Sequence, residues 1–168
     1  CCHVLPLQPG QRHALDEVAL REEEEDHDRR DHDRRGGHEH PVLRAVCVAK
    51  HVEAEADRHG AQLLYDGASY HLACFVGQQV AEKALKAFIY AQGEEFVTGH
   101  SVEMLCRWAA EFDLDFRKLR EAAAPLDGYY IPTRYPNGLP DSIPARVYTR
   151  PVAEQVLRLA DQVLDLVY

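Results

Sequence analysis

The chain has 168 residues and a net charge of -9, with 28 Asp and Glu against 19 Lys and Arg. This length suits one domain with a single core, and the acidic balance disfavours a general electrostatic grip on nucleic-acid backbone while leaving room for a local basic patch. No apolar run approaches the ~20 residues of a membrane-spanning helix, and the N-terminus lacks the basic and apolar regions of a secretory signal. We therefore expect a soluble cytoplasmic protein.

Residues 1–40 differ in composition from the rest of the chain. Charged residues, His and Gly dominate the stretch REEEEDHDRRDHDRRGGHEH, which has no apolar periodicity. We expect a charged tail over residues 1–40 that is either disordered or non-native sequence, followed by a helical domain over residues 41–168. The four His between residues 27 and 40 leave two interpretations, a weak metal-binding tract or a solvated charged tail.

Two long helical patterns open the domain. Apolar residues recur at near-helical spacing from Val42 to Leu64, interrupted at Gly60. The next helix is predicted over about residues 68–92, because residues 70–91 contain one Gly, no Pro and mostly strong helix formers. At about 100° per residue, apolar side chains cover most of its circumference, which predicts a central position in a bundle.

The second half of the domain predicts shorter helices and a loop. Ser101 is expected to cap a helix over about 102–112, and Pro125 predicts an early end or a kink in the next one, about 114–127. Residues 128–147 contain four prolines, which argue against a helix, so this segment is expected to be functional or disordered. A last helix follows at about 149–167, with Pro151 in its first turn.

These patterns predict an all-α fold, an up-and-down helical bundle of four to five helices with a Pro-rich loop before the last helix. Cysteines 47, 74 and 106 lie among apolar residues of predicted helices and are expected to be buried free thiols. No pair has Cys-x2-Cys spacing, so we predict no metal, and no cofactor.

The Pro-rich loop is the first candidate site. Its sequence YYIPTRYPNGLP brings together Tyr129, Tyr130, Thr133, Arg134 and Tyr135. An arginine fork flanked by tyrosines suits a phosphate or a stacked base. The alternative is that the tyrosine rings cover the end of the bundle while Arg134 pairs with a bundle carboxylate.

The central helix carries the second candidate site. Gln78, Glu82 and Lys86 recur every four residues and share one face. They form either a row that faces a ligand or partner, or an exposed face with an ordinary Glu82–Lys86 ion pair. His100 is expected to cap the third helix.

Three motifs, HLACFVGQQVAEKALKAFIYAQG, GHSVEML and LDGYYIPTRYP, resemble the HEPN domain family of prokaryotes in order and spacing. The resemblance runs from about residue 42 to residue 168 and implies a homodimer. Many members of the superfamily are metal-independent ribonucleases with an Arg-x4–6-His motif near the start of the final helix. In this chain no His follows His100. Arg35-x4-His40 and Arg44-x6-His51 have the spacing of the motif, but they lie in the charged tail and in the first predicted helix, far from the final helix. Whether the protein is an enzyme therefore stays open.

The resemblance also implies a second role. Small stand-alone HEPN proteins are commonly paired with a minimal nucleotidyltransferase in systems of toxin–antitoxin type, and nucleotide binding has been proposed for the family. We therefore expect a nucleotide-binding module or a nucleotidyltransferase partner, with no membrane role. One alternative is a metal-independent ribonuclease that cleaves RNA at a non-standard site. The other is a non-catalytic helical adaptor.

Overall fold

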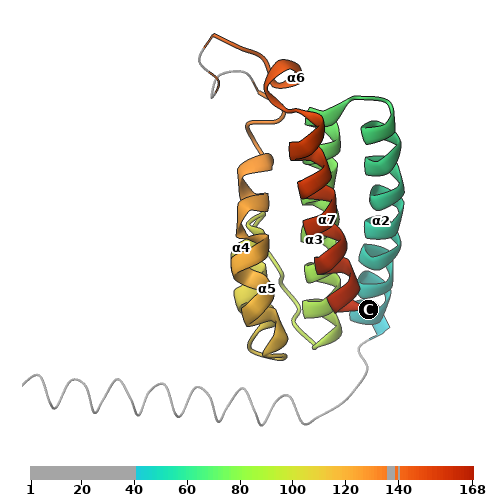
Figure 1. The fold of residues 1–168 in the computed structure, drawn as a ribbon. Helices are drawn as coiled ribbons and strands as arrows, with labels where there is room; N and C mark the ends of the chain where they lie inside the picture. The colour runs from blue at the N-terminus through green and yellow to red at the C-terminus, as the bar shows by residue number, and fades with distance from the viewer. Residues whose placement is uncertain (1–40, 136–138, 140) are drawn as a thin grey trace, which may run out of the picture. The chain divides into compact units, whose positions relative to one another are not determined.

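The computed structural model describes residues 41–135, 139 and 141–168. The elements in chain order are α2 (Pro41–Asp66), α3 (Tyr70–Ala91), α4 (Val102–Ala109), α5 (Asp115–Ala123), the 3-10 helix η1 (Ala124–Tyr129), α6 (Pro144–Val147) and α7 (Arg150–Val167). No strand occurs among these residues, and the fold is the predicted all-α bundle (Figure 1). Residues 1–40, Pro136 and Pro140, for which predictions were made from the sequence, are outside the described residues.

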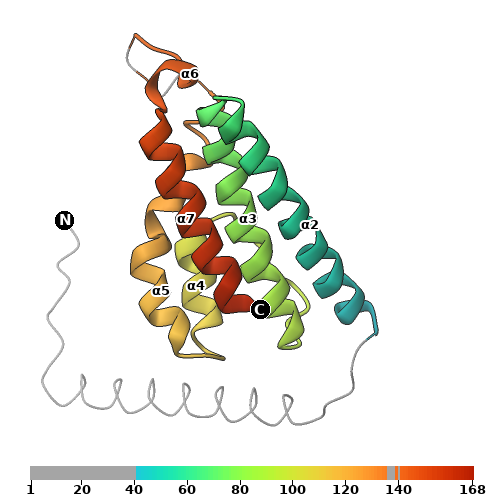
Figure 2. The same cartoon turned by 45° about the vertical axis from the view of Figure 1, so that its right-hand side comes forward.

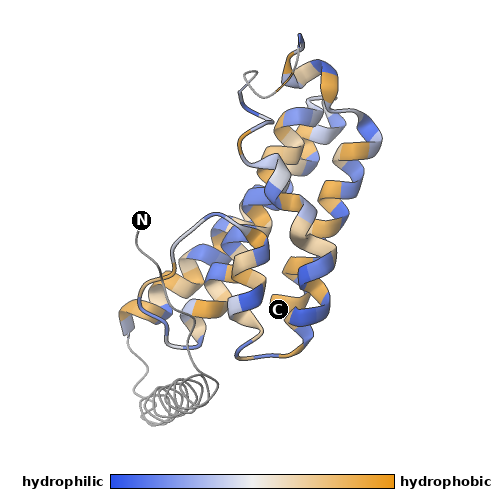
Figure 3. Ribbon diagram, turned by 90° about the vertical axis from the view of Figure 1, so that its left-hand side faces the viewer, coloured by the Kyte–Doolittle hydropathy of each residue, from blue (hydrophilic) through white to orange (hydrophobic). Residues whose placement is uncertain are grey.

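Helix α3 occupies the centre of the bundle, as its wide apolar face predicts. It contacts α2, α4, α6, α7 and η1 (Figure 2). Small residues allow this close packing: a Cβ added at Gly77 would lie only 2.9 Å from Cγ1 of Val156 in α7. Polar and apolar residues alternate along the outer helices (Figure 3), as in helices that bury one face. Helices α2, α4 and α7 pack against α3, whereas α5 packs against α4 and α7.

The first helix corrects one expectation. Helix α2 runs without a break from Pro41 to Asp66, although the sequence suggested an interruption at Gly60. A single glycine costs a helix only about 1 kcal/mol, which the packing of α2 along α3 outweighs. A β-carbon at Gly60 would meet nothing within 4 Å, so this glycine makes no close contact that requires it.

The boundaries around α4 and α5 follow the capping residues. Ser101 is the N-cap of α4 as predicted, and its Oγ accepts a hydrogen bond from the Met104 amide at 3.1 Å. The carboxylate of Asp127 strengthens this cap by accepting from Ser101 Oγ at 2.6 Å and from the Val102 amide at 2.5 Å. His100 therefore does not cap the helix. Helix α4 ends at Ala109, earlier than expected, and α5 gives way to η1 just before Pro125.

The Pro-rich segment contains one short helix that the sequence did not predict. Helix α6 begins at Pro144, where the missing amide hydrogen is not needed, and Pro151 lies in the first turn of α7 as expected. The last turn of α2, the first turns of α3 and α7, residues 129–135 and α6 gather at one end of the bundle, which we call the α6 end (Figures 1 and 2).

The connection between α3 and α4 departs from a strict up-and-down path. After Gln92 the chain returns along α3, because the His100 carbonyl accepts a hydrogen bond from Gln78 in the first half of that helix. Fourteen helical residues correspond to about 21 Å, so residues 93–99 retrace most of α3. This return places His100 against the side of the central helix.

Burial explains the state of the thiols. Cys74 and Cys106 are buried and free, as predicted, while free Cys47 is half-buried. Burial raises the pKa of Cys74 and of Cys106 to about 12, so neither thiol is reactive near neutral pH.

In the described part of the chain, every helix is too short or too polar to cross a bilayer.

Candidate functional site

Arg134 lies over three aromatic rings near the α6 end. Its guanidinium carbon is 4.5 Å from the ring centroid of Phe75, 4.7 Å from that of Tyr130 and 5.4 Å from that of Tyr135. Its Nε donates a hydrogen bond to the Tyr130 carbonyl at 2.9 Å. These contacts hold the exposed arginine in place by cation–π attraction and one hydrogen bond. No carboxylate among the described residues pairs with it, unlike the alternative derived from the sequence.

His100 connects this arginine to the polar row of α3. Its ring stacks on Tyr130 with centroids 4.7 Å apart and an interplanar angle of 15°. The guanidinium of Arg134 contacts the same ring. On its other side, Nδ1 of His100 lies 3.1 Å from Oε1 of Glu82. The two candidate sites of the sequence are therefore one continuous cluster, which we call the Arg134–His100 cluster: Phe75, Gln78, Glu82, Lys86, His100, Tyr130, Arg134 and Tyr135.

The polar row of Gln78, Glu82 and Lys86 lies in the interior, so the alternative of an exposed face is wrong. Gln78 is fully buried and Glu82 is 5% exposed. Glu82 forms the expected ion pair with Lys86, at 2.9 Å, and accepts a hydrogen bond from Gln78 Nε2 at 3.2 Å. Gln79 Nε2 lies 3.3 Å from the same carboxylate. Buried polar groups that satisfy one another in this way fix a single arrangement of their neighbours.

Glu82 is held in its ionised form. Burial acts to raise its pKa, but hydrogen bonds and charge from Lys86, with hydrogen bonds from Gln78 and His100, outweigh burial and keep the pKa below its ordinary value. An ionised carboxylate only accepts, so Nδ1 of His100 carries the hydrogen. The other ring nitrogen, Nε2, belongs to a side chain that is 57% exposed and is the one left to act on a ligand.

Two of the predicted loop residues support the loop from inside. Tyr129 packs against the core, with its ring 5.9 Å from that of Tyr148, and burial raises its pKa. Thr133 is fully buried and its Oγ1 donates to the Tyr129 carbonyl at 2.5 Å. Tyr135, in contrast, is 51% exposed. The structure thus exposes Arg134 and Tyr135, half-buries Tyr129 and Tyr130, and buries Thr133.

Sequence reasoning missed Phe75 and the role of His100. In the sequence, Phe75 is one of many apolar residues of α3. Its contact with Arg134 depends on the fold, because the two residues are far apart in the chain. His100 reaches Glu82 because the chain returns along α3, a path that no local pattern encodes.

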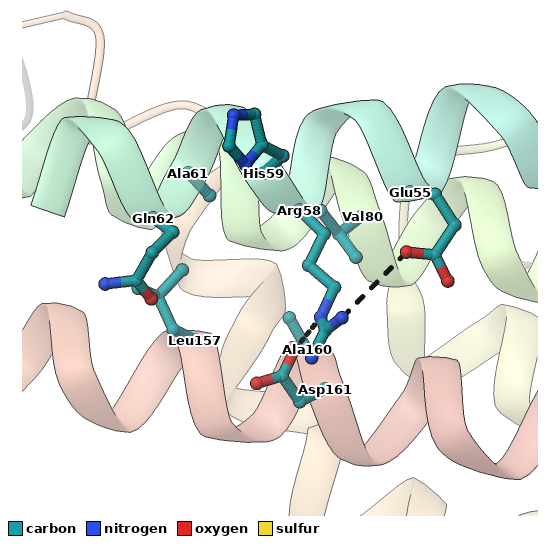
Figure 4. A pocket seen from close by; sticks show the side chains of 9 residues that line it. All are labelled: Glu55, Arg58, His59, Ala61, Gln62, Val80, Leu157, Ala160 and Asp161. Carbon is teal, nitrogen blue, oxygen red and sulfur yellow. Dashed lines mark hydrogen bonds and ion pairs between the residues drawn. The ribbon is translucent and has the colours of Figure 1, made fainter.

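A separate cavity of about 290 Å³ lies between α2 and α7 (Figure 4). Arg58 of α2 crosses it to pair with Asp161 of α7 at 2.7 Å, and lies 3.9 Å from Glu55. None of the predicted site residues lines this cavity. Because its arginine is already neutralised by carboxylates, the cavity is less suited to an anionic ligand than the Arg134–His100 cluster.

These features define an all-α bundle with a buried polar network beneath an aromatic-bound arginine. The model of the HEPN domain family matches residues 51–168, and the chain belongs to this family. The match begins at His51, nine residues later than the sequence motifs suggested.

Two solved structures are similar to this chain. The crystal structure of TT1696 from Thermus thermophilus has 41% sequence identity and a TM-score of 0.68, over 72% of this chain and 94% of that one. ST0689, an archaeal HEPN homologue, has 32% identity and a TM-score of 0.60, over 72% of this chain and 93% of its own. A comparison with curated proteins finds no match.

Proposed function

We propose that this HEPN protein binds a nucleotide at the Arg134–His100 cluster. The observation that carries the proposal is the exposed guanidinium of Arg134, held over three rings and paired with no carboxylate of the described residues. With Nε of Arg134 bonded to the Tyr130 carbonyl, its two terminal Nη groups remain to bind phosphate oxygens in a bidentate manner. The half-exposed ring of Tyr135 offers a face on which a base stacks.

In this proposal the polar row supports the site and does not contact the ligand. Glu82 orients His100, while Lys86 and Gln78 keep Glu82 ionised and fixed. His100 in turn stacks on Tyr130, whose carbonyl holds Arg134. A change at Glu82 therefore reaches the phosphate-binding arginine through three contacts, by way of His100 and Tyr130, which makes Glu82 a positioning residue.

The experiment measures nucleotide affinity and melting temperature on the same variants. Arg134→Lys keeps the charge but loses the fork, so it weakens binding. Arg134→Ala weakens it further, by about 1.5–3 kcal/mol for a lost charged hydrogen bond. Arg117→Ala is the matched control, because Arg117 is exposed on α5, and within the described residues its side chain forms no ion pair. If both Arg134 variants bind as the parent does but melt several degrees lower, the loop is a structural clamp and the proposal fails.

The proposal extends to a protein partner. We infer from the family resemblance that a minimal nucleotidyltransferase pairs with this chain, in a system of toxin–antitoxin type. The net charge of -9 suits a protein partner or a small nucleotide better than unspecific contact with nucleic-acid backbone. A nucleotidyltransferase reading frame beside the gene, and co-elution of the two co-expressed proteins, are the expected results. Separate elution at micromolar concentrations would contradict the pairing.

Ribonuclease activity is a second candidate, favoured by one observation. His100 and Arg134 contact the same tyrosine ring, and Glu82 orients the imidazole. In metal-independent cleavage of RNA, the 2′-oxygen attacks the phosphorus and the bond to the 5′-oxygen breaks. An arginine holds the phosphate, and a histidine takes the 2′-hydroxyl proton and returns a proton to the leaving 5′-oxygen. This role predicts cleavage of single-stranded RNA that His100→Ala abolishes, while nucleotide affinity falls by less than in Arg134→Ala. If single-stranded RNA stays intact in the presence of the parent protein, ribonuclease activity is excluded.

A further inference from the structure

A second arginine at the α6 end has the same kind of surroundings as Arg134. Arg150 begins α7, and its Nε donates to the Tyr70 hydroxyl at 3.0 Å. Its guanidinium carbon lies 5.2 Å from the ring centroid of Tyr65 and 5.6 Å from that of Tyr70. The two tyrosine rings meet edge to face at 5.8 Å. Arg150 is therefore an exposed cation held by aromatic contacts and one hydrogen bond.

The charges around Arg150 leave it available to an anion. Arg58, Arg120 and Arg158 pair with carboxylates, whereas Arg150 pairs with none among the described residues. The first turns of α3 and α7 contain no acidic residue. Asp66, at the end of α2, accepts a hydrogen bond from Gln62 at 2.9 Å. In a chain with a net charge of -9, this end thus presents two aromatic-bound arginines without carboxylate partners in the described structure.

Both arginines lie against the start of α3. Arg150 contacts Tyr70 and Arg134 contacts Phe75, five residues further along the same helix. Five residues correspond to about 7.5 Å along the helix axis and about 140° around it. The two guanidinium groups consequently flank the first turns of α3 on different sides, and one phosphate group does not occupy both positions.

We propose that Arg150, with Tyr65 and Tyr70, forms a second phosphate-binding subsite, so that the ligand of the α6 end is a short single-stranded oligonucleotide and not a mononucleotide. This inference rests on the proposed nucleotide site at Arg134. A chain with several phosphates satisfies both arginines at once, and its bases stack on the tyrosines of either subsite. A duplex is a poor fit, because its paired bases are not free to stack on protein rings.

The test compares a mononucleotide with a single-stranded RNA and a single-stranded DNA of about eight nucleotides. We expect the parent protein to bind the oligonucleotides more tightly than the mononucleotide. Arg150→Ala weakens oligonucleotide binding roughly five- to tenfold and leaves the mononucleotide affinity unchanged, because one phosphate contact is lost. The slope of log Kd against log salt concentration also falls, by about 0.7 for one released counterion on a single strand.

Two further variants separate binding from folding. Tyr70→Phe keeps the ring but removes the hydroxyl that accepts from Arg150 Nε, so it weakens oligonucleotide binding by less than Arg150→Ala. Arg117→Ala, which removes one exposed charge from α5, leaves the preference for oligonucleotides intact. Melting temperatures of all variants show whether the fold is retained.

The outcomes distinguish this inference from the proposal on which it rests. If Arg134→Ala abolishes mononucleotide binding while Arg150→Ala and Tyr70→Phe bind oligonucleotides as the parent does, the second subsite does not exist and the nucleotide site stands. If neither ligand depends on Arg134, the nucleotide site itself is wrong. Equal affinity of the parent for the mononucleotide and the oligonucleotides would also overturn the second subsite.

Discussion

At the scale of single residues, Glu82 shows how far sequence reasoning reaches. The i, i+4 spacing predicts its ion pair with Lys86, and the pair forms. Its burial and its contact with His100 were not predictable, because both depend on a turn that lies 18 residues further along the chain. The grouping of Tyr130, Arg134 and Tyr135 was predictable, since these residues are neighbours in one Pro-rich loop.

The low pKa of Glu82 predicts how stability depends on pH. Its folded pKa is below the ordinary 4.5, so the ionised carboxylate stabilises the fold above about pH 4.5, and this contribution is lost as pH falls through the folded pKa. Glu82→Gln removes it and leaves Lys86 unpaired, which lowers the free energy of unfolding at pH 7 by about 1–3 kcal/mol. Denaturant unfolding of parent and variant from pH 7 to pH 3 measures the difference. The gap between them should narrow in acid; a constant gap would show that the charge of Glu82 is not involved.

At the scale of helices, the order and type of the main elements were predictable and some connections were not. Strong apolar periodicity identified α2, α3 and α7 because each presents a long face to the core. The early end of α4, the start of α6 at Pro144 and the return of residues 93–99 along α3 are set by tertiary contacts. The continuity of α2 through Gly60 is another example, since packing against α3 overrides a weak local preference.

Two glycines in neighbouring helices predict opposite responses to alanine. A Cβ at Gly77 would lie 2.9 Å from Val156 Cγ1, so Gly77→Ala forces α3 and α7 apart. Overpacking costs about 1–3 kcal/mol, which exceeds the gain of about 1 kcal/mol in helix propensity. Gly60→Ala meets no atom within 4 Å and stabilises α2 by about 0.5–1 kcal/mol. Thermal unfolding of both variants checks this pair; equal stabilisation would show that α3 and α7 are less closely packed than described.

At the scale of the whole molecule, the family and the all-α bundle were predictable from three motifs and the helical periodicity. The assembly and the tail are proposals. Helix α2 carries four large apolar side chains that are more than half exposed, Val42, Val48, Val52 and Leu63. Apolar surface of this kind on a small protein favours association, in agreement with the homodimer that the family resemblance implies.

We expect a homodimer at micromolar concentration. Light scattering should give twice the mass of one chain, and Val48→Asp together with Val52→Asp should shift the protein toward monomer if α2 forms the contact, because a buried interface does not tolerate unpaired charges. Val48→Thr is the milder control. A monomeric mass for the parent across the micromolar range would contradict the dimer.

The tail is tested by truncation. We expect that removal of residues 1–40 leaves the melting temperature of the domain unchanged, because this charged stretch has little apolar surface to bury. Calorimetry of the full chain and of residues 41–168 measures the effect. A large fall in the melting temperature on truncation would mean that the tail belongs to the folded unit.

The central claim, that a nucleotide binds at Arg134, is tested most directly by NMR of the arginine side chains during a nucleotide titration. The Nε–H resonance of Arg134 is assigned by its absence from the spectrum of Arg134→Lys. The account predicts a saturable shift of this resonance and of the His100 ring signals, with little change at Arg117. Saturable binding that leaves the Arg134 and His100 resonances unmoved would place the nucleotide elsewhere and contradict the claim.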